Sequence, residues 1–327
     1  MSKTKVSLIA GGAGFIGSNL IKYLQTENRH IVVLDNMSRG SESFLTPASG
    51  FRDSSITTMV GDCSDLRTVN DALKLAGDFG VVDEVWHLAA NSDIPAGITN
   101  ANVDLKDTFL TTFALLEGMK RYKIGTFNFA SSSAIYGDFG GAPIHEEAGP
   151  LLPISNYGAM KLASEALISA AVESCLQHAN IFRFPNVVGI PATHGVILDF
   201  IRRLIDTPQL LTVLGDGSQK KAYLHVSDLI DAMLLVRGRK VSKKIELINI
   251  GPIDDGITVR SIAESVVERV SPSAIIRYGQ GNKGWVGDVP KFSYSTKRIR
   301  SYGWMPNLDS RGAVTRAINE IALQLGQ

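Results

Sequence analysis

Short apolar runs alternate with amphipathic segments through the first half of the chain. The runs are apolar through most of their length, which is typical of parallel strands buried on both faces. We expect strands at Val6–Ala10, Ile31–Asp35, Ile56–Val60, Glu84–Ala89, Gly125–Ser131 and Ala179–Pro185. Apolar residues three and four positions apart predict helices at Ser18–Gln25, Leu66–Leu75, Leu105–Lys123 and Asn156–Gln177. This alternation predicts an α/β fold with a doubly wound parallel sheet.

The alternation loosens beyond Gly189, where loops rich in Gly and Pro follow, such as Gly215–Gly217 and Gly279–Gly287. We therefore expect two interleaved domains without repeats or a low-complexity linker. Residues 1–185, with a returning segment near 223–252, form the sheet domain. Residues 186–327 mainly form a smaller substrate-binding domain.

The apolar stretch at the N-terminus has two interpretations. Two lysines ahead of Val6–Ile16 resemble the start of a secretory signal. Gly11, Gly14 and Gly17 interrupt that stretch, and no cleavage site of small residues follows, so we favour a buried strand, a turn and a helix. No run reaches the roughly 18 apolar residues that a membrane span needs, and we expect a soluble protein without a membrane partner.

Composition excludes several classes of function. The 327 residues include 33 Lys and Arg against 32 Asp and Glu, a net charge of +1, which gives no electrostatic reason to expect nucleic acid as a partner. The two cysteines, Cys63 and Cys175, form no CxxC pair, which favours a reducing cytoplasm. The six histidines, His87 and His225 among them, show no metal-ligand spacing, so we predict no metal.

The segment GGAGFIG, residues 11–17, follows a predicted strand and opens a predicted helix. Gly11 permits the tight turn, Gly14 permits close approach to a pyrophosphate, and Gly17 lets the helix pack against the sheet. Asp35 ends the next predicted strand, 18 residues after Gly17, where a carboxylate accepts hydrogen bonds from a ribose diol. The pattern predicts a Rossmann-type sheet that binds NAD, although Arg39 keeps NADP open.

Further candidates for the cofactor site follow from the same arrangement. The third predicted strand ends in GDC, which places Asp62 and Cys63 where an adenine ring would lie, although Cys63 also fits a small apolar filler. The expected cofactor-binding residues from this part of the chain are Gly11, Gly14, Phe15, Ile16, Gly17, Asp35, Asn36, Asp62 and Cys63.

Tyr157 and Lys161 lie four residues apart on a predicted helix and therefore share one face. A phenol with a pKa near 10 becomes a base at neutral pH only if its pKa falls to about 7, which requires roughly 4 kcal/mol. A neighbouring ammonium can supply much of that energy, and an oxidised nicotinamide can add more. The alternative is an ordinary surface pair on a helix.

The ordered motifs decide between these alternatives. GGAGFIG, GDCSD (61–65), HLAA (87–90), SSSAIYG (131–137), YGAMK (157–161), RFPNVVG (183–189), GDGSQKKAYLHVSD (215–228) and GWVGDVP (284–290) run in one order over nearly the whole chain. This set resembles the extended short-chain dehydrogenases/reductases, and among them the NAD-dependent nucleotide-sugar epimerase/dehydratase family. The resemblance implies that Ser132 binds the sugar hydroxyl, that Tyr157 is the base and that Lys161 is its electrostatic partner and a ribose ligand. It also places Leu88, Ala89 and Ala90 beside NAD, and Ser133 and Asn186 beside the sugar nucleotide.

The resemblance also bears on the reaction. Dehydratases of the family carry an Asp–Glu pair directly after the serine or threonine, where this chain has Ser133 and Ala134. Neither residue is a general acid or base near neutral pH, so epimerisation at C4 through a transient 4-keto sugar, with bound NAD carrying the hydride, is favoured. A nucleotide-sugar dehydrogenase, a reductase or a 4,6-dehydratase is the alternative, and a cofactor-sensing protein without turnover is a more distant one.

Three departures from the family pattern concern the substrate. Lys221, beside Lys220, and Trp285, near Lys283, replace two arginines that bind the diphosphate. Thr108 replaces an asparagine. Lysine neutralises a phosphate but lacks the bidentate fork, so a nucleoside diphosphate sugar is expected while its base stays open.

The family resemblance also implies a homodimer. The helices 105–123 and 156–177 are the expected interface, with Phe109, Phe113 and Leu116 on an apolar stripe. A helix buried within one subunit would show the same stripe. Phe292 is either a residue that limits sugar size or part of the core.

Overall fold

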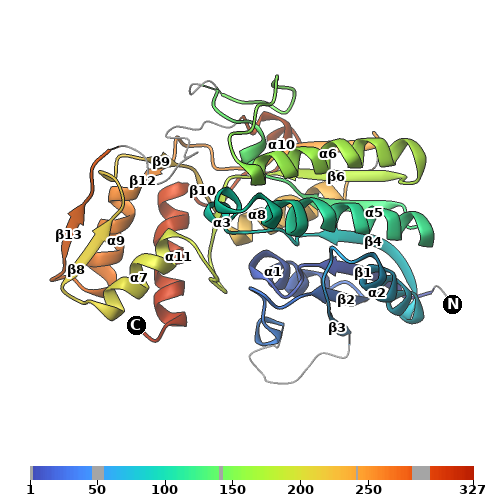
Figure 1. Ribbon diagram of the computed structural model, residues 1–327, viewed down its shortest axis with the longest axis horizontal. Coiled ribbons are helices and arrows are strands. Elements are labelled where there is room, and N and C mark those ends of the chain that lie inside the picture. Colours follow the sequence, from blue (N-terminus) through green and yellow to red (C-terminus); the bar gives the residue numbers. More distant parts are fainter. Residues whose placement is uncertain (1–2, 46–54, 140–142, 241, 282–294) are drawn as a thin grey trace. The chain divides into compact units, whose positions relative to one another are not determined.

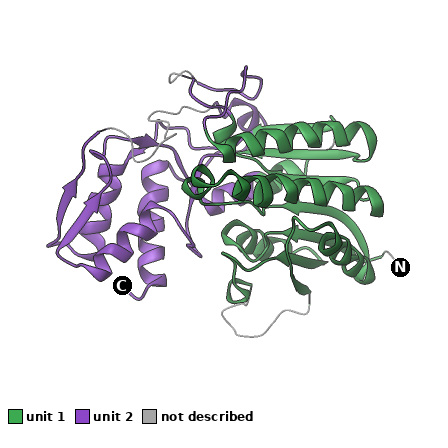
Figure 2. Cartoon of the chain, viewed as in Figure 1, with its two compact units in different colours: residues 1–135, 155–183, 233–248 green, residues 136–154, 184–232, 249–327 purple. Residues whose placement is uncertain are grey.

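Two units make up the chain when its residues are grouped by their contacts (Figure 2). The first comprises residues 1–135, 155–183 and 233–248, and the second comprises 136–154, 184–232 and 249–327. The computed structural model describes residues 3–45, 55–139, 143–240, 242–281 and 295–327.

The predicted boundary at residue 185 does not separate segment 136–154, which groups with the second unit. The Tyr136 hydroxyl donates to Asn249 Oδ1 at 2.7 Å, and Asn249 Nδ2 donates to the Ile144 carbonyl at 3.1 Å. These contacts are long-range in sequence, so no local pattern could indicate them.

A seven-stranded sheet forms the centre of the first unit, in the order β11-β6-β5-β4-β1-β2-β3 (Figure 1). Parallel pairing joins β6 to β5, β5 to β4, β4 to β1, β1 to β2 and β2 to β3. The strands are β1 (Lys5–Ala10), β2 (Arg29–Asp35), β3 (Ile56–Val60), β4 (Val81–His87), β5 (Thr126–Ala130), β6 (His178–Arg183) and β11 (Ile245–Asn249). The doubly wound sheet that the sequence predicts is confirmed, with strand ends shifted by a few residues.

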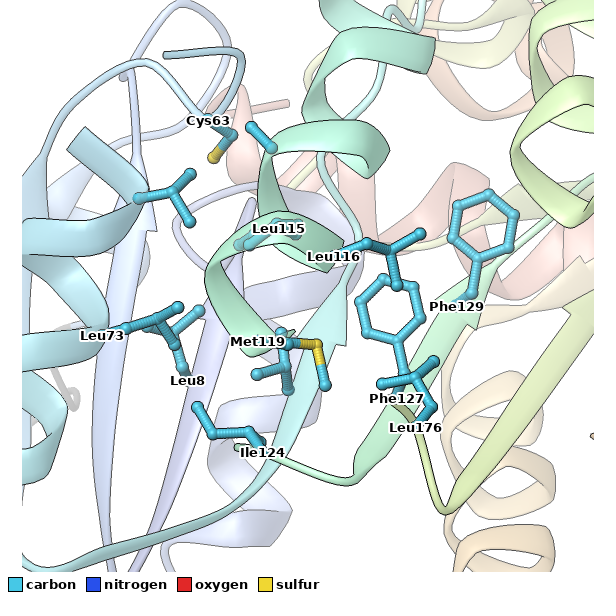
Figure 3. Packing of buried hydrophobic residues seen from close by; sticks show 14 of the residues in the cluster. Leu8, Cys63, Leu73, Leu115, Leu116, Met119, Ile124, Phe127, Phe129 and Leu176 are labelled. Atoms are coloured by element: carbon cyan, nitrogen blue, oxygen red, sulfur yellow. The ribbon is translucent and has the colours of Figure 1, made fainter. Parts of the chain in front are cut away.

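Helices cover the sheet because both of its faces are apolar. Leu8 and its neighbours on one face pack against α2 (Leu66–Phe79), α5 (Thr111–Tyr122) and α6 (Asn156–Ser174), as the close view in Figure 3 illustrates. Ile9, Ile31 and Val33 point to the opposite face, because side chains alternate along a strand, and are also fully buried. Helix α1 (Phe15–Leu24) contributes Leu20 and Leu24 to the core.

The predicted helix at 105–123 is present, but its first part is a π-helical turn and the helical region begins before Leu105. The chain forms α3 (Ile94–Thr99), α4 (Ala101–Asp104), the π-helical turn η2 (Leu105–Leu110) and only then α5. A π-helical turn inserts one extra residue into a helix, and such turns occur frequently at functional sites. The apolar spacing alone does not distinguish a helix with this insertion from a regular one.

Buried polar side chains also cross the sheet, which the apolar strand pattern does not predict. Ser7 donates to Glu84 at 2.7 Å, Asn128 donates to the other oxygen of Glu84 at 3.2 Å, and Asn180 donates to Asn128 at 2.8 Å. Arg237 pairs with Glu84 at 2.7 Å and with Glu27 at 2.7 Å. Burial lowers the pKa of its guanidinium, but Glu27 and Glu84 together raise it above its ordinary value. Every carboxylate oxygen of Glu84 therefore has a partner, as a buried charge requires.

The second unit is more regular than the Gly- and Pro-rich sequence suggests. Helices α7 (Val196–Asp206), α9 (Val259–Val270) and α11 (Ser310–Gln324) enclose an apolar core. Short strand pairs accompany them. These are β7 (Asn186–Val188) with β10 (Tyr223–His225), β8 (Leu210–Val213) with β13 (Ile275–Tyr278), and β9 (Lys220–Lys221) with β12 (Ile257–Thr258). Helix α8 (Val226–Arg237) runs from this unit into the first, and α10 (Lys297–Ser301) is short.

Within the described ranges, no helix is both long enough and apolar enough to cross a membrane.

Candidate active site

The glycine loop has the geometry of a dinucleotide cradle. Gly11 adopts φ +78°, and a Cβ there would lie 2.5 Å from the Ala89 amide nitrogen. A Cβ on Gly17 would lie 2.4 Å from the Gly11 carbonyl oxygen. Gly14 caps α1 without a side-chain hydrogen bond, so the first N–H groups of this helix, from Phe15 onward, are available to a phosphate.

Asp35 lies at the carboxyl end of β2 beside this loop. Its carboxylate accepts hydrogen bonds from the Ala13 N–H at 3.0 Å and the Met37 N–H at 2.9 Å, one on each oxygen. Burial raises the pKa of Asp35, and the two backbone hydrogen bonds oppose this shift. Each oxygen retains capacity for another hydrogen bond, so the residue can accept a ribose diol.

Asp62 and Cys63 differ in character although they are adjacent. Burial alone would raise the pKa of Asp62, but hydrogen bonds from Lys106 and Ser64 hold it below its ordinary value. The Lys106 ammonium lies 2.8 Å from the Asp62 carboxylate. Asn36, another predicted cofactor residue, accepts the Ser38 N–H at 3.0 Å. Burial raises the pKa of the Cys63 thiol to about 12, which suits an apolar filler rather than a reactive group.

The segment Leu88–Ala90 is held against the glycine loop by backbone contacts. The Leu88 and Ala89 N–H groups both donate to the Ala10 carbonyl, at 2.8 and 3.0 Å. On the next turn of the chain, Asp93 pairs with Arg39 at 3.2 Å. Because β1 lies between β4 and β2, this ion pair spans the sheet edge where the glycine loop begins. Arg39 is the residue that kept NADP as an alternative cofactor in the sequence analysis. In the structure its guanidinium is paired with the Asp93 carboxylate.

Substituting Gly11 with alanine tests the cradle. We expect the free energy of unfolding to fall by about 1–3 kcal/mol, because alanine is strained at positive φ and its Cβ meets backbone atoms. We also expect the Kd for NAD to rise at least about tenfold, measured by calorimetry. Gly77→Ala on α2 is the matched control, since a Cβ there meets nothing within 4 Å. It should leave the Kd unchanged and raise the free energy of unfolding by up to about 1 kcal/mol, because alanine favours a helix over glycine. Equal effects of the two substitutions would contradict this account.

Ser132, Tyr157 and Lys161 come together at the carboxyl end of β5. Ser155 caps α6 by accepting the Gly158 N–H at 3.1 Å, which fixes the first turn that carries Tyr157. Ser132 hydrogen-bonds the Tyr157 hydroxyl. Lys161, which is buried, donates from Nζ to the Ala130 carbonyl at 2.6 Å, and Nζ lies 5.9 Å from the centre of the Tyr157 ring.

The electrostatics of this group differ from the expectation that Lys161 lowers the pKa of Tyr157 toward neutrality. Burial raises the pKa of Tyr157 to about 12, its hydrogen bond with Ser132 lowers it, and the charge of Asp104 raises it. Burial also lowers the pKa of Lys161 to about 7, against the charge of Glu165. Burial therefore disfavours the charged form of both Tyr157 and Lys161.

Two residues that support this group were missed by the sequence analysis. Glu165 lies one turn after Lys161, accepts the Ser131 hydroxyl at 2.5 Å and pairs with Arg183 through both oxygens at 2.9 and 2.5 Å. This buried cluster holds the serine loop against α6 and β6. Two signals in the sequence could have indicated them. Glu165 follows Lys161 by four residues on the same helix, and Arg183 begins the RFPN segment.

Two of the remaining predicted substrate residues, Asn186 and Lys221, belong to the second unit. Asn186 is exposed on β7, and its Nδ2 lies 3.4 Å from the Ala222 carbonyl, next to Lys221 on β9. Ser133 lies in the short helix η3 (Ser133–Ile135) of the first unit. Trp285, Lys283 and Phe292 lie outside the described residues. Among the described residues, no three His, Cys, Asp or Glu side chains gather to hold a metal ion.

The glycine cradle, the acid at the end of β2 and the Ser–Tyr–Lys group define a dinucleotide-binding protein of the Rossmann type. The sequence profile described as "NAD dependent epimerase/dehydratase family" matches residues 7–251. The chain belongs to this family, and NAD is its cofactor.

Individual proteins of known structure or activity are similar over nearly the whole chain. The UDP-glucose 4-epimerase of Azospirillum brasilense is 27% identical over 95% of this chain and 90% of its own length. A crystal structure of a UDP-galactose 4-epimerase is 31% identical, with a TM-score of 0.84 over 98% of this chain and 99% of that one. The dTDP-glucose 4,6-dehydratase of Streptomyces venezuelae, solved with NAD, is 25% identical, with a TM-score of 0.84 over 98% of both chains.

Proposed function

We propose that the protein is an NAD-dependent epimerase that inverts C4 of a nucleoside diphosphate sugar. The observation that carries this proposal is the group formed by Ser132, Tyr157 and Lys161 at the end of β5, one strand away from the Leu88–Ala90 segment. The epimerases to which the chain is similar over nearly its whole length support the same reaction.

In the proposed reaction, Ser132 orients the C4 hydroxyl of the sugar and Tyr157 Oη takes its proton. Bound NAD supplies the oxidising power that makes C4 trigonal and the reducing power that restores it on the other face. Tyr157 then returns the proton to the oxygen. Lys161 stabilises the charged form of Tyr157, because an ammonium near a phenolate favours ionisation.

Ser133 and Ala134 favour epimerisation over elimination. Loss of water from the sugar requires a general acid and a general base in addition to Tyr157, and neither residue can serve as one near neutral pH. A dehydrogenase, a reductase or a 4,6-dehydratase is the second candidate, which the similarity to the dehydratase structure supports.

Lys220 and Lys221 support a diphosphate as part of the substrate. Both lie on β9, and Lys220 is 3.9 Å from Asp255, a distance at which an exposed pair contributes little and leaves the cation accessible. A uridine nucleotide is the first candidate because the similar epimerases are named for UDP-sugars.

Product analysis without added cofactor tests the reaction class. UDP-, dTDP-, GDP- and CDP-sugars are incubated with the purified protein and separated by chromatography. A C4 epimer with no net NADH supports the proposal. Accumulation of NADH, or of a stable keto sugar, would instead establish the second candidate.

Asp35→Asn tests the proposed choice of cofactor. Loss of the charge weakens hydrogen bonds from the ribose diol and removes the repulsion of a 2′-phosphate. We expect the Kd for NAD to rise roughly tenfold and the ratio of the Kd values for NADP and NAD to fall, measured by calorimetry on protein freed of cofactor. Asp78→Asn, on the exposed surface of α2, should change neither value. An unchanged Kd for NAD would remove Asp35 from the site.

Three further properties are part of this proposal. The first unit binds NAD, and the second mainly binds the substrate. The protein works in the cytoplasm, where its two free thiols stay reduced.

The protein forms a homodimer through α5 and α6, supported by the exposed side chains of Leu110 and Phe113. Leu116 does not belong to that surface, because it is buried in the core (Figure 3). Sedimentation velocity tests the dimer.

A further inference from the structure

A chain of hydrogen bonds inside the first unit joins three elements next to Lys161. His87 is the last residue of β4, Thr112 lies in the first turn of α5, and Ser164 lies on α6. His87 Nε2 is 2.9 Å from Thr112 Oγ1, which donates to Ser164 Oγ at 3.0 Å. All three side chains are fully buried. The three residues are separated by 25 and 52 positions in the sequence.

Thr112 Oγ1 is placed to donate its single hydroxyl proton to Ser164 or to the Thr108 carbonyl, 3.3 Å away. In that arrangement the His87 imidazole donates from Nε2, and Nδ1 carries a lone pair. Thr111 Oγ1 lies 3.4 Å from the same Nε2. No hydrogen-bond partner of Nδ1 occurs in the described part of the chain. Burial and the charge of Lys161 lower the pKa of His87 well below its ordinary value, so the ring is neutral.

The hydrogen-bonded chain of His87, Thr112 and Ser164 lies beside the proposed catalytic group. Ser164 is three residues after Lys161 and therefore on the same face of α6. The Phe129 ring lies near both His87 and Lys161, since its centre is 5.4 Å from the His87 ring and 4.6 Å from Lys161 Nζ. Both adjacent threonines, Thr111 and Thr112, are buried directly after the π-helical turn, where Thr108 supplies the carbonyl that they share.

We propose that Thr112 and Ser164, hydrogen-bonded to each other and anchored to His87, are positioning residues for Lys161. This hydrogen-bonded chain fixes α6 against the end of β4, so that Lys161 Nζ stays at the Ala130 carbonyl and beside the Tyr157 ring. Small displacements of such groups are costly, because misplacement by about 1 Å can reduce a rate about 10²-fold. This inference rests on the proposed function, which assigns Lys161 to the reaction.

Paired substitutions of Thr112 test the proposal. Thr112→Val keeps the shape of the side chain and removes the hydroxyl, whereas Thr112→Ser keeps the hydroxyl. We expect Thr112→Val to lower kcat roughly tenfold with less than about a twofold change in KM. Thr112→Ser should restore kcat to within about twofold of the unmodified protein. Ser164→Ala, which breaks the chain at its other end, should repeat the loss if Thr112→Val fails to fold.

A second readout separates positioning from the reaction itself. The titration of Lys161 is followed by competitive labelling with acetic anhydride at several pH values and peptide mass spectrometry. Charged or titratable groups near Lys161 are Tyr157 and Glu165 on α6, Arg183 on β6, His87 on β4 and Asp104 on α4. None of these is changed by the substitutions. We expect the midpoint to rise by about half to one pH unit in Thr112→Val, because α6 loosens and water reaches Nζ.

The outcomes are distinct. Equal kcat and equal Lys161 titration in the Val and Ser variants would overturn the positioning role. If the unmodified protein epimerises no sugar, the proposed function fails, whereas the titration of Lys161 still decides whether the chain positions this residue.

Discussion

Replacing Tyr157 with phenylalanine is expected to lower kcat by about 10³-fold, because the hydroxyl is the group that moves the substrate proton. NAD binding should change by less than about threefold, since the ring and the packing of α6 are retained. Initial rates and calorimetry measure the two quantities.

Tyr122→Phe is the matched control for this loss. Tyr122 is partly exposed at the end of α5, away from Ser132, and its substitution should leave kcat unchanged. If Tyr157→Phe keeps more than about a tenth of the activity, the tyrosine is not the base, and the interpretation of the Ser–Tyr–Lys group is wrong.

Lys161→Met is expected to lower kcat by about 10²-fold or more and to stabilise the fold. Burial lowers the pKa of Lys161 to about 7, so the folded protein holds an ammonium that water would bind more favourably. Glu165 is already paired with Arg183, so removal of Lys161 leaves no unpaired carboxylate. Because replacement of a buried charge by an apolar side chain of similar volume often stabilises a protein, we expect a gain of about 1–4 kcal/mol at pH 7, measured by urea denaturation.

The pH dependence of stability checks the same group. In the unfolded chain the lysine binds its proton up to a pH of about 10.5, whereas in the folded chain it releases the proton above a pH of about 7. The unfolded state therefore holds more protons between these values, and the stability of the unmodified protein rises with pH across that window. Lys161→Met should remove this rise, and the surface substitution Lys74→Met should keep it. The same slope in the unmodified protein and the Met variant would show that Lys161 titrates normally.

The glycine turn, the helix after it and the position of Asp35 were predictable from the sequence because their signals are local. Gly11, Gly14 and Gly17 lie within seven residues, and Asp35 ends the next strand, so neighbouring positions alone indicate the turn, the helix start and the acid. The order of the motifs adds Ser132, Tyr157 and Lys161 by resemblance. Their roles remain predictions that the substitutions above decide.

The rest depends on contacts that are distant in sequence. Nothing near His87 indicates that Thr112 and Ser164 complete a hydrogen-bonded chain, and nothing near Glu84 indicates Arg237. The raised pKa of Tyr157 also depends on its burial by several elements. The spacing of Tyr157 and Lys161 in the sequence does not indicate that burial. Helix α7, in contrast, was missed although Ile197, Ile201 and Leu204 repeat at helical spacing, because the Gly- and Pro-rich surroundings indicated loops.

The π-helical turn between Asp104 and Thr111 illustrates the same limit. An apolar stripe continues through it, so periodicity predicts one helix. Directly after the turn, Thr111 and Thr112 both donate to the Thr108 carbonyl, and Thr112 also hydrogen-bonds His87. Thr108, where the family resemblance leads us to expect an asparagine, accepts the Asn91 N–H at 3.2 Å and is fully buried. The structure thus places this departure inside the network that joins β4 to α6.

The central claim is that the protein inverts C4 of a nucleotide sugar by oxidising and reducing that carbon with its own bound NAD. The most direct measurement is incubation of UDP-galactose that carries deuterium at C4 with the purified protein and no added cofactor, followed by NMR of the products. The account predicts UDP-glucose with the deuterium retained at C4 and no net NADH. An unchanged sugar configuration, or a C4 epimer whose deuterium has exchanged with water, would contradict it.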